Sequence, residues 1–341
     1  MMEYLEHFGL RAEPFSNAPV TRFYYDSTQH GRALKRLMYA AKQAKGLAVL
    51  SGGIGAGKTT LARRLLDALS DREFEAALLV IIHRDVTSDW LLRRIALQLG
   101  VVQPSVDKLT LLSQLYRRLL DIHERGKKAV VLVDEAQMLT SRELMEELRG
   151  LLNLEVPERK LLSFILFGLP EIESCLAMDP PLAQRVSMRV RLEPFDSGST
   201  HAYIQHRLQV AGATHPIFDV RAISEVHLAS SGVPRIINTI CDNALLEASL
   251  NDHRSVGPDI VRDVAENLGL LTIDETKRIV PERPLPQPAP SQTPFRDASE
   301  DLTPLPTSQT PMMWPLEEPM DDATAAALEE IDRVLASLGK V

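Results

Sequence analysis

One short stretch restricts the fold of this chain more than any other, the run Gly-Gly-Ile-Gly-Ala-Gly-Lys-Thr at residues 52–59. It matches the phosphate-binding pattern G-x-x-x-x-G-K-[ST], in which glycines leave backbone N–H groups free to surround an anion. The pattern requires a strand before it and a helix after it. Residues 47–50 are an apolar run typical of a strand, and residues 59–66 have helical spacing. We therefore expect Lys58 to reach the β- and γ-phosphates of ATP and the Thr59 hydroxyl to bind Mg²⁺.

A second element of a phosphate site follows another apolar run. Residues 129–133 are apolar and are followed directly by Asp134 and Glu135. A strand here would carry Asp134 to the sheet edge where the phosphates lie, so Asp134 is the expected second Mg²⁺ ligand. Glu135 is the expected general base for the attacking water. Two adjacent acids can also mark a solvated turn, but the upstream P-loop favours the metal site.

Strand and helix patterns alternate along the first part of the chain. Strands are expected at residues 47–50, 76–82, 129–135, 161–167 and 186–192, with helical periodicity between them. Such alternation is typical of a parallel α/β sheet that is covered on both faces. After Pro194 only helical patterns remain. We expect a nucleotide-binding α/β domain at residues 1–195 and an all-helical lid domain at residues 196–272.

The composition changes after residue 272. Residues 281–319 hold 11 of the 22 prolines, with Ser, Thr and Gln between them. Such a segment buries too little apolar surface to offset its chain entropy, so residues 273–322 are expected to be a disordered linker. Residues 323–341 are expected to form a short amphipathic helix, with Leu328 and Leu335 on its apolar face. This helix is either a docking element for a protein partner or a frayed end without a role.

Charge is unevenly distributed. Residues 275–341 contain 6 Lys and Arg against 12 Asp and Glu, which leaves 32 against 34 in the first 274 residues. The near-neutral first part argues against a strongly basic nucleic-acid domain. The start shows no signal peptide and no apolar run is long enough to span a bilayer, so a cytoplasmic protein is expected. Cys175 and Cys241 lie outside any C-x-x-C pair and are expected to be buried thiols.

Aromatic residues gather near the start of the chain, at Phe8, Phe15 and residues 23–25. They either pack against an adenine ring or form part of an apolar core. Packing requires no ligand, and we favour it.

The order of motifs resembles that of the AAA+ ATPases of the ExeA type, from general secretion pathway protein A. The P-loop is followed by Asp-Glu-Ala-Gln at residues 134–137, then Gln184-Arg185, then Gly-Val-Pro-Arg-Ile-Ile-Asn at residues 232–238. The opening Tyr-Leu-Glu-His-Phe-Gly-Leu at residues 4–10, with Glu-Pro-Phe-Ser at residues 13–16, also looks like the start of that group. The resemblance covers roughly residues 3–270. ATPases of the TniB transposition type are similar over the same span.

The resemblance implies roles for several arginines. Arg235 corresponds to a sensor 2 arginine, carried by the lid onto the γ-phosphate. Arg185 lies where such ATPases keep an arginine finger that reaches a neighbouring subunit, with Arg189 as a substitute. A surface ion pair is the alternative reading of Arg185. The expected catalytic residues are Lys58, Glu135, Arg185 and Arg235. The expected cofactor-binding residues are Gly52, Gly53, Ile54, Gly55, Ala56, Gly57, Lys58, Thr59, Thr60 and Arg235.

The sequence departs from the family pattern at Leu169, where relatives usually have a polar residue after the fourth strand. A leucine has no donor or acceptor with which to hold the attacking water. Gln137 is the nearby side chain that can substitute. We therefore expect ATP hydrolysis to be slow without a partner.

These patterns predict an ATP-binding and ATP-hydrolysing protein that acts as an assembly switch in secretion, envelope or polysaccharide export machinery. The alternative is a DNA-associated ATPase regulator of the transposition type. An inert P-loop scaffold does not fit the intact Lys58, Asp134 and Glu135. An ATP-dependent homo-oligomer and a protein partner of the C-terminal segment are expected.

Overall fold

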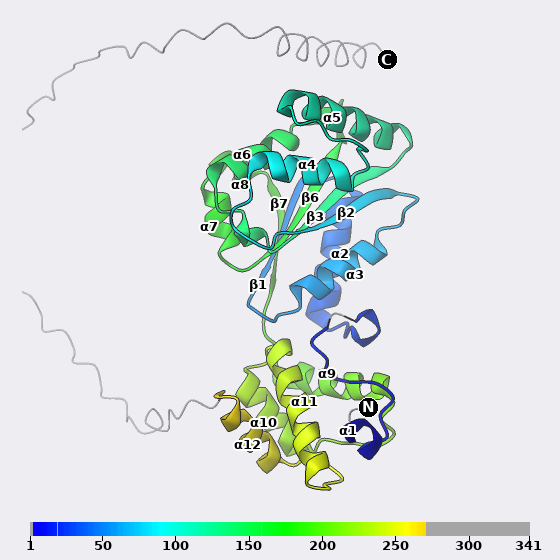
Figure 1. Ribbon diagram of the computed structural model, residues 1–341, viewed down its shortest axis with the longest axis vertical. Helices are drawn as coiled ribbons and strands as arrows, with labels where there is room; N and C mark the ends of the chain where they lie inside the picture. The colour runs from blue at the N-terminus through cyan, green and yellow to red at the C-terminus, as the bar shows by residue number, and fades with distance from the viewer. Residues whose placement is uncertain (1–2, 19, 158, 271–341) are drawn as a thin grey trace, which may run out of the picture.

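The computed structural model describes residues 3–18, 20–157 and 159–270. The expected linker at residues 273–322 and the expected helix at residues 323–341 therefore lie outside the described residues. Figure 1 shows two parts, a sheet with helices and a bundle of helices, arranged one above the other.

The first part is built on a five-stranded sheet in the order β2-β3-β6-β1-β7. Every neighbouring pair in it is parallel. The strands are β1 (Leu47–Gly52), β2 (Phe74–Val80), β3 (Lys128–Asp134), β6 (Leu162–Gly168) and β7 (Val186–Leu192). The predicted parallel α/β core is confirmed, and both ends of each of the five strands lie within two residues of the predicted range. A short hairpin of β4 (Glu155–Val156) and β5 (Arg159–Lys160) was not predicted.

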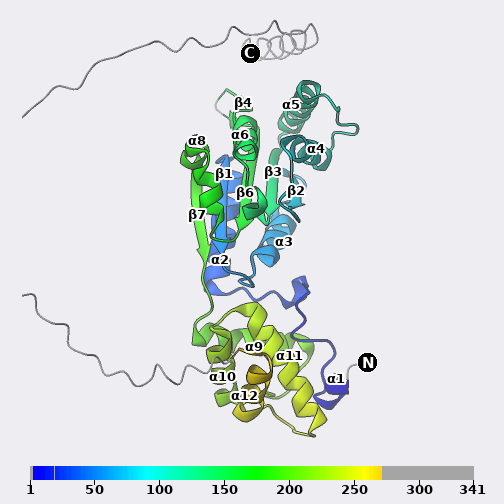
Figure 2. The same cartoon turned by 60° about the vertical axis from the view of Figure 1, so that its left-hand side comes forward.

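Helices cover both faces of this sheet, as Figures 1 and 2 show. One face carries α2 (Thr28–Lys42) and α3 (Lys58–Ala68). The other carries α4 (Ser88–Gln98), α5 (Lys108–Glu124), α6 (Arg142–Leu151), α7 (Ile172–Ala177) and α8 (Pro180–Gln184). Side-chain oxygens cap the N-termini of several of these helices. At the start of α5, for example, the Asp107 carboxylate accepts a hydrogen bond of 2.8 Å from the Thr110 N–H.

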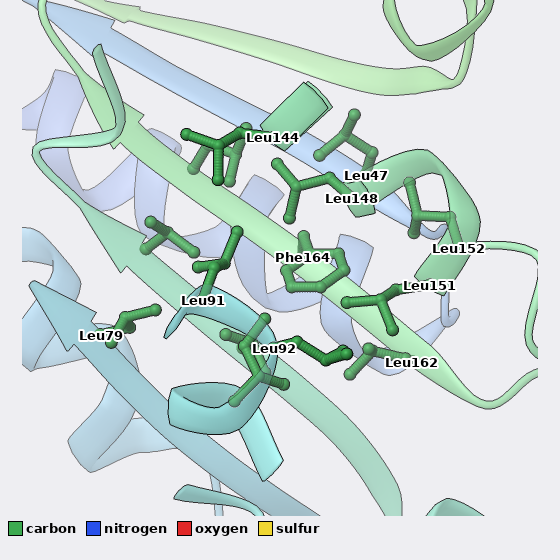
Figure 3. Close-up of a cluster of buried hydrophobic side chains, with 14 of the residues drawn as sticks. Leu47, Leu79, Leu91, Leu92, Leu144, Leu148, Leu151, Leu152, Leu162 and Phe164 are labelled. Atoms are coloured by element: carbon green, nitrogen blue, oxygen red, sulfur yellow. The ribbon is translucent and has the colours of Figure 1, made fainter. Parts of the chain in front are cut away.

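Strand residues alternate between two apolar cores, since successive side chains of a strand point to opposite faces. In β1, Leu47 and Val49 belong to the core beneath α4–α8, whereas Ala48 and Leu50 belong to the core beneath α2 and α3. Figure 3 shows leucines of α4 and α6 gathered around Phe164 of β6. Both faces are thus buried at the central strands β1, β3 and β6, which is why these strands are nearly continuous apolar runs.

The second part consists of α9 (Ser197–Ala211), α10 (Val220–Ser230), α11 (Pro234–Leu250) and α12 (Pro258–Asn267). It has its own core, and that core includes the N-terminal Tyr4, Phe8, Phe15 and Phe23. The predicted unit 1–195 therefore contains an opening segment, with α1 (Glu3–His7), whose side chains pack against the C-terminal helices. Most of the aromatic cluster forms core, as the sequence favoured. Cys175 and Cys241 are buried and free, as expected.

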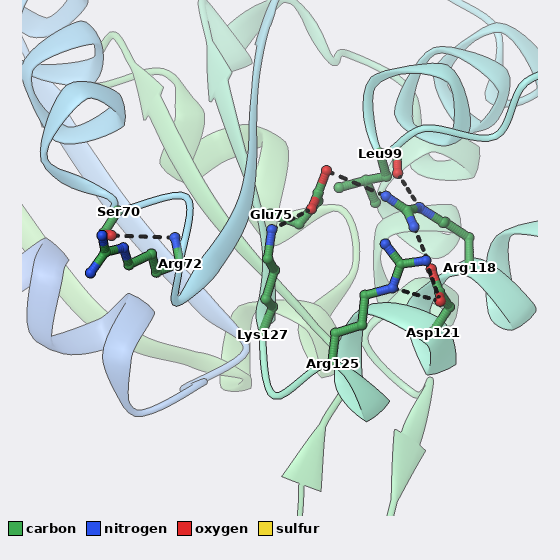
Figure 4. Close-up of polar contacts among 8 residues, drawn as sticks. All are labelled: Ser70, Arg72, Glu75, Leu99, Arg118, Asp121, Arg125 and Lys127. Carbon is green, nitrogen blue, oxygen red and sulfur yellow. Dashed lines mark hydrogen bonds and ion pairs between the residues drawn. The ribbon is translucent and has the colours of Figure 1, made fainter.

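Polar contacts lie at the amino ends of the strands, at the opposite end of the sheet from the P-loop (Figure 4). Glu75, near the start of β2, lies 3.4 Å from both Arg118 and Lys127. Arg118 also donates to the Leu99 carbonyl at 2.7 Å and pairs with Asp121. These contacts tie α5 to the starts of β2 and β3. The carboxyl ends of the strands, at the other end of the sheet, face the helical part.

The two parts meet where the chain leaves β7. The Phe195 N–H donates to the Gly232 carbonyl at 2.8 Å. Gly232 has φ +74°, and a Cβ placed on it would lie 1.9 Å from the Phe195 carbonyl oxygen. Only glycine allows this approach of two backbones.

We predict that Gly232→Ala destabilises the protein by about 1–3 kcal/mol, because the added methyl group requires a backbone shift at a positive φ. Thermal unfolding should show a lowered midpoint. Gly150→Ala is the matched control, since Gly150 lies inside α6 with nothing within 4 Å of the added Cβ, and it should be neutral or stabilising by up to about 1 kcal/mol. Equal midpoints for the two variants would contradict the prediction.

Candidate nucleotide-binding site

The carboxyl edge of the sheet opens onto a cavity of about 510 Å³ between the two parts. The P-loop follows β1, Asp134 ends β3 and Leu169 follows β6, so adjacent strands deliver all three to one edge. The opposite wall comes from the helical part and the N-terminal segment. Its lining residues include Asn17, Tyr24, Phe195, Tyr203, Pro234 and Arg235. In open α/β sheets ligands bind in the crevice beyond the carboxyl ends of the strands, as here.

The P-loop turns directly into α3, which begins at Lys58. Gly57 at the helix N-cap has φ +92°. The first N–H groups of α3 therefore face the cavity edge, where an anion is favoured.

Lys58 is buried at this turn, with 6% of its surface exposed. Its Nζ donates to the carbonyl oxygens of Gly52 at 3.0 Å and Gly53 at 2.9 Å. Burial lowers the pKa of Lys58, and the nearby carboxylates of Glu135 and Asp134 oppose that effect. A buried ammonium held mainly by neutral carbonyls is suited to an anionic ligand.

Asp134 and Thr59 lie together and fit a magnesium ion. Asp134 is 1% exposed, and its carboxylate accepts hydrogen bonds from the Thr59 hydroxyl and, at 3.0 Å, from the Glu135 N–H. Burial raises the pKa of Asp134, while these hydrogen bonds lower it. Mg²⁺ prefers oxygen ligands and is usually held by one or two protein groups together with substrate phosphates. One carboxylate and one hydroxyl beside the P-loop meet that requirement.

Glu135 follows at the start of the short 3₁₀ turn η2 (Ala136–Met138), in the left-handed region with φ +55°. Its carboxylate lines the cavity and accepts a hydrogen bond of 2.6 Å from the Gln137 side-chain amide. A non-glycine residue in this backbone region stores strain, which is common at functional sites.

Arg235 reaches the cavity from the first turn of α11. Its backbone N–H donates to the Gly55 carbonyl at 3.3 Å. A Cβ added to Gly55 would lie 2.6 Å from the Cβ of Arg235, so glycine is required for the helical part to rest on the P-loop. The Arg235 side chain is exposed and free to turn toward a bound ligand.

Comparison with known proteins agrees with this geometry. Residues 41–176 match the model of the AAA domain family. General secretion pathway protein A of Aeromonas hydrophila is 40% identical over 261 residues, which cover 75% of this chain and 47% of that protein. The chain belongs to the AAA+ ATPases. Its resemblance to the ExeA type is confirmed.

Solved structures share the AAA+ fold. The ORC2 protein of Aeropyrum pernix, in ADPNP and ADP complexes, has a TM-score of 0.56 at 18% identity, over 72% of this chain and 71% of that one. Drosophila ORC bound to DNA has a TM-score of 0.57 at 19% identity, over 78% of this chain and 66% of that one. At these identities the likeness shows the fold alone. This chain spans about half the length of its secretion relative, 47%. No helix in residues 3–270 is long and apolar enough to cross a membrane.

The AAA+ cavity does not include the two arginines expected to act as fingers. Arg185 follows α8, is exposed, and donates to the Asn153 side chain at 2.6 Å and the Arg149 carbonyl at 3.2 Å. Arg189 lies on the edge strand β7 and pairs with Glu173 at 3.4 Å. Both lie outside the cavity of their own subunit, so the finger role stays a prediction that concerns a second copy.

Two buried residues of the AAA+ site escaped the sequence reasoning. His30 is 5% exposed; its Nε2 lies 3.2 Å from the Ala56 carbonyl and its Nδ1 lies 2.8 Å from the Ser27 hydroxyl. Arg207 donates to Tyr203 at 2.7 Å and to the Ser16 carbonyl at 3.0 Å, and so fastens the N-terminal segment to α9. His30 lies in α2 and Arg207 in α9, and helical periodicity does not identify their distant partners.

The buried His30 predicts a pH dependence. Burial lowers the pKa of His30, so the unfolded chain binds a proton more readily than the folded one. Its contribution to stability is complete above its ordinary pKa of about 6.5 and is lost as the pH falls below that value.

We predict that His30→Gln removes part of the loss of stability between about pH 7.5 and pH 5.5, at most about 1.4 kcal/mol per pH unit. Chemical unfolding at a series of pH values measures it. His215→Gln, at an exposed histidine, is the control and should keep the parental slope. A His30→Gln protein with the parental slope would refute the assignment.

Proposed function

We propose that this protein binds Mg·ATP in the cavity and hydrolyses it. The observation that carries the proposal is that Lys58, Thr59 and Glu135 line one cavity, with Arg235 on the opposite wall. Asp134 lies beside this cavity and is hydrogen-bonded to Thr59. Three separate segments of chain supply these groups.

Each group then has a defined task. The N–H groups of the P-loop and the Lys58 ammonium hold the phosphates. Thr59 and Asp134 hold Mg²⁺, which when bound neutralises charge on the phosphate oxygens. Glu135 polarises the attacking water. Arg235 makes the position of the helical part depend on the nucleotide, because a guanidinium from that part binds the γ-phosphate.

We further propose that the nucleotide state controls assembly with a partner in secretion, envelope or polysaccharide export machinery, in the cytoplasm. The support is the 40% identity to General secretion pathway protein A. A DNA-associated role is the competing possibility. A mobility shift of DNA with ATP present, at increasing salt, separates the two, since phosphate contacts weaken steeply with salt. We expect no specific shift.

The first test of this proposed function concerns Lys58 and Glu135. Lys58→Ala should abolish ATP binding, because the cavity loses the cation that faces the phosphates. Glu135→Gln should keep binding but lower turnover by about 10²-fold or more, because the amide cannot accept the proton of the water. Titration with a fluorescent ATP analogue and a phosphate-release assay measure the two effects. Parental turnover by Glu135→Gln would show that Glu135 is not the general base.

The second concerns Arg185, which we propose completes the site of a neighbouring subunit. Arg185→Ala and Lys58→Ala each remove a different half of a shared site, so mixing the two proteins should restore part of the ATPase activity. Arg189→Ala replaces Arg185→Ala in a parallel mixture and identifies which arginine acts. No recovery in a mixture shown to co-assemble would count against a shared site.

The third concerns rate. Leu169 offers no polar side chain to the attacking water, and one lost polar contact typically costs about 10²-fold in rate. We expect basal turnover below about 1 per second, against about 10 per second for a typical enzyme. Such a rate suits a switch that a partner releases. Turnover at tens per second by the isolated protein would exclude this role.

The same assay tests the C-terminal segment, which we propose binds the partner. A chain ending at residue 271 should keep the basal rate, since the cavity described within residues 3–270 is lined by residues up to Asn238. Only the full chain should retain the partner in a pull-down. Loss of ATP binding on truncation would contradict the proposed separation of tasks.

A further inference from the structure

Gln137 occupies the space between the general base and the end of β6. Its side-chain amide donates to the Glu135 carboxylate at 2.6 Å, and its side-chain carbonyl accepts from the Leu169 N–H at 3.0 Å. Its backbone carbonyl is contacted by the Cys175 thiol at 3.6 Å. Gln137 is 7% exposed, so these contacts have little competition from water.

The orientation of the Gln137 amide is determined by its two partners. A backbone N–H can only donate and an ionised carboxylate can only accept. The oxygen of Gln137 must therefore face Leu169, and its nitrogen must face Glu135. Close packing adds to this restraint, since a Cβ placed on Gly168 would lie 3.0 Å from the side-chain oxygen of Gln137.

This arrangement gives Leu169 a polar function that its side chain lacks. Leu169, directly after β6, donates its backbone N–H to the Gln137 side chain, and the Gln137 amide in turn donates to Glu135. A backbone N–H is present whatever side chain occupies the position, proline excepted. The hydrogen bonds that connect the end of β6 to the general base are therefore present even though residue 169 is a leucine.

We propose that Gln137 is a positioning residue that aims the Glu135 carboxylate at the attacking water, through an anchor on the Leu169 backbone. The proposal rests on the proposed function, because it takes Glu135 as the general base. Glu135 has no other side-chain hydrogen-bond partner among the described residues. Without Gln137 its carboxylate can rotate, and a misplacement of about 1 Å can cost about 10²-fold in rate.

Two substitutions of similar size separate the two bonds of Gln137. Gln137→Glu keeps an acceptor for the Leu169 N–H but loses the donor and places a second negative charge beside Glu135. Gln137→Met keeps the volume and loses both bonds. We expect kcat to fall by about 10²-fold in each, with the dissociation constant for ATP within about threefold of the parent. Gln98→Glu, at an exposed position at the end of α4, is the matched control and should leave both unchanged.

A double substitution distinguishes positioning from a structural role. If Gln137 acts only through Glu135, adding Gln137→Met to Glu135→Gln should lower the single-turnover rate by less than about threefold further. A structural role would instead add its own loss and weaken ATP binding.

Three outcomes would overturn the inference. They are parental kcat in both Gln137 variants, a changed ATP affinity with unchanged kcat, or a full additional loss in the double variant. Parental turnover by Glu135→Gln would refute the general base itself, and with it the proposed mechanism. An inactive Glu135→Gln beside fully active Gln137 variants would refute only the role of Gln137.

Discussion

The nucleotide site depends on a close approach of two backbones. The helical part rests on the P-loop because the Arg235 N–H reaches the Gly55 carbonyl at 3.3 Å. It joins the sheet because Gly232 lies against the Phe195 backbone. Neither contact leaves room for a side chain on its glycine. The contact between Arg235 and Gly55 lies at the cavity, so a movement of the helical part away from the P-loop breaks it.

The two buried charges of the site, on Lys58 and Asp134, are only partly compensated by hydrogen bonds within the protein. Burial lowers the pKa of Lys58 and raises that of Asp134, so both charged forms are opposed by their surroundings. Such groups cost stability in the absence of partners. Hydrogen bonds to carbonyls, to Thr59 and to the Glu135 N–H offset part of that cost. Phosphate oxygens and a divalent cation are complementary to what remains.

Hydrogen bonds connect the site to distant segments of chain. His30 joins the first long helix to the P-loop at Ala56, and Arg207 joins α9 to the N-terminal segment. Gln137 joins β3 to β6. Each wall of the cavity is thus bonded to an element that lies elsewhere in the sequence. A change at the nucleotide can therefore reach both parts of the molecule through direct contacts.

The sequence alone determined the sheet, its helices and the position of the P-loop after β1. Apolar runs that alternate with helical periodicity allow few folds besides a covered parallel sheet. Local motifs such as the P-loop carry their own geometry, because neighbouring glycines and a following helix shape the loop.

Only the tertiary structure decided the contacts between segments far apart in the chain. It placed Phe8 and Phe15 in the helical core, left Arg185 outside the cavity of its own subunit, and connected Gln137 to the backbone of Leu169. No local pattern reports these contacts, because a side chain buried by a distant partner has the same periodicity as one buried by its neighbour. The leucine after β6 illustrates this limit. Its side chain lacks a polar group for the attacking water, while its backbone N–H, which every residue except proline shares, donates to Gln137.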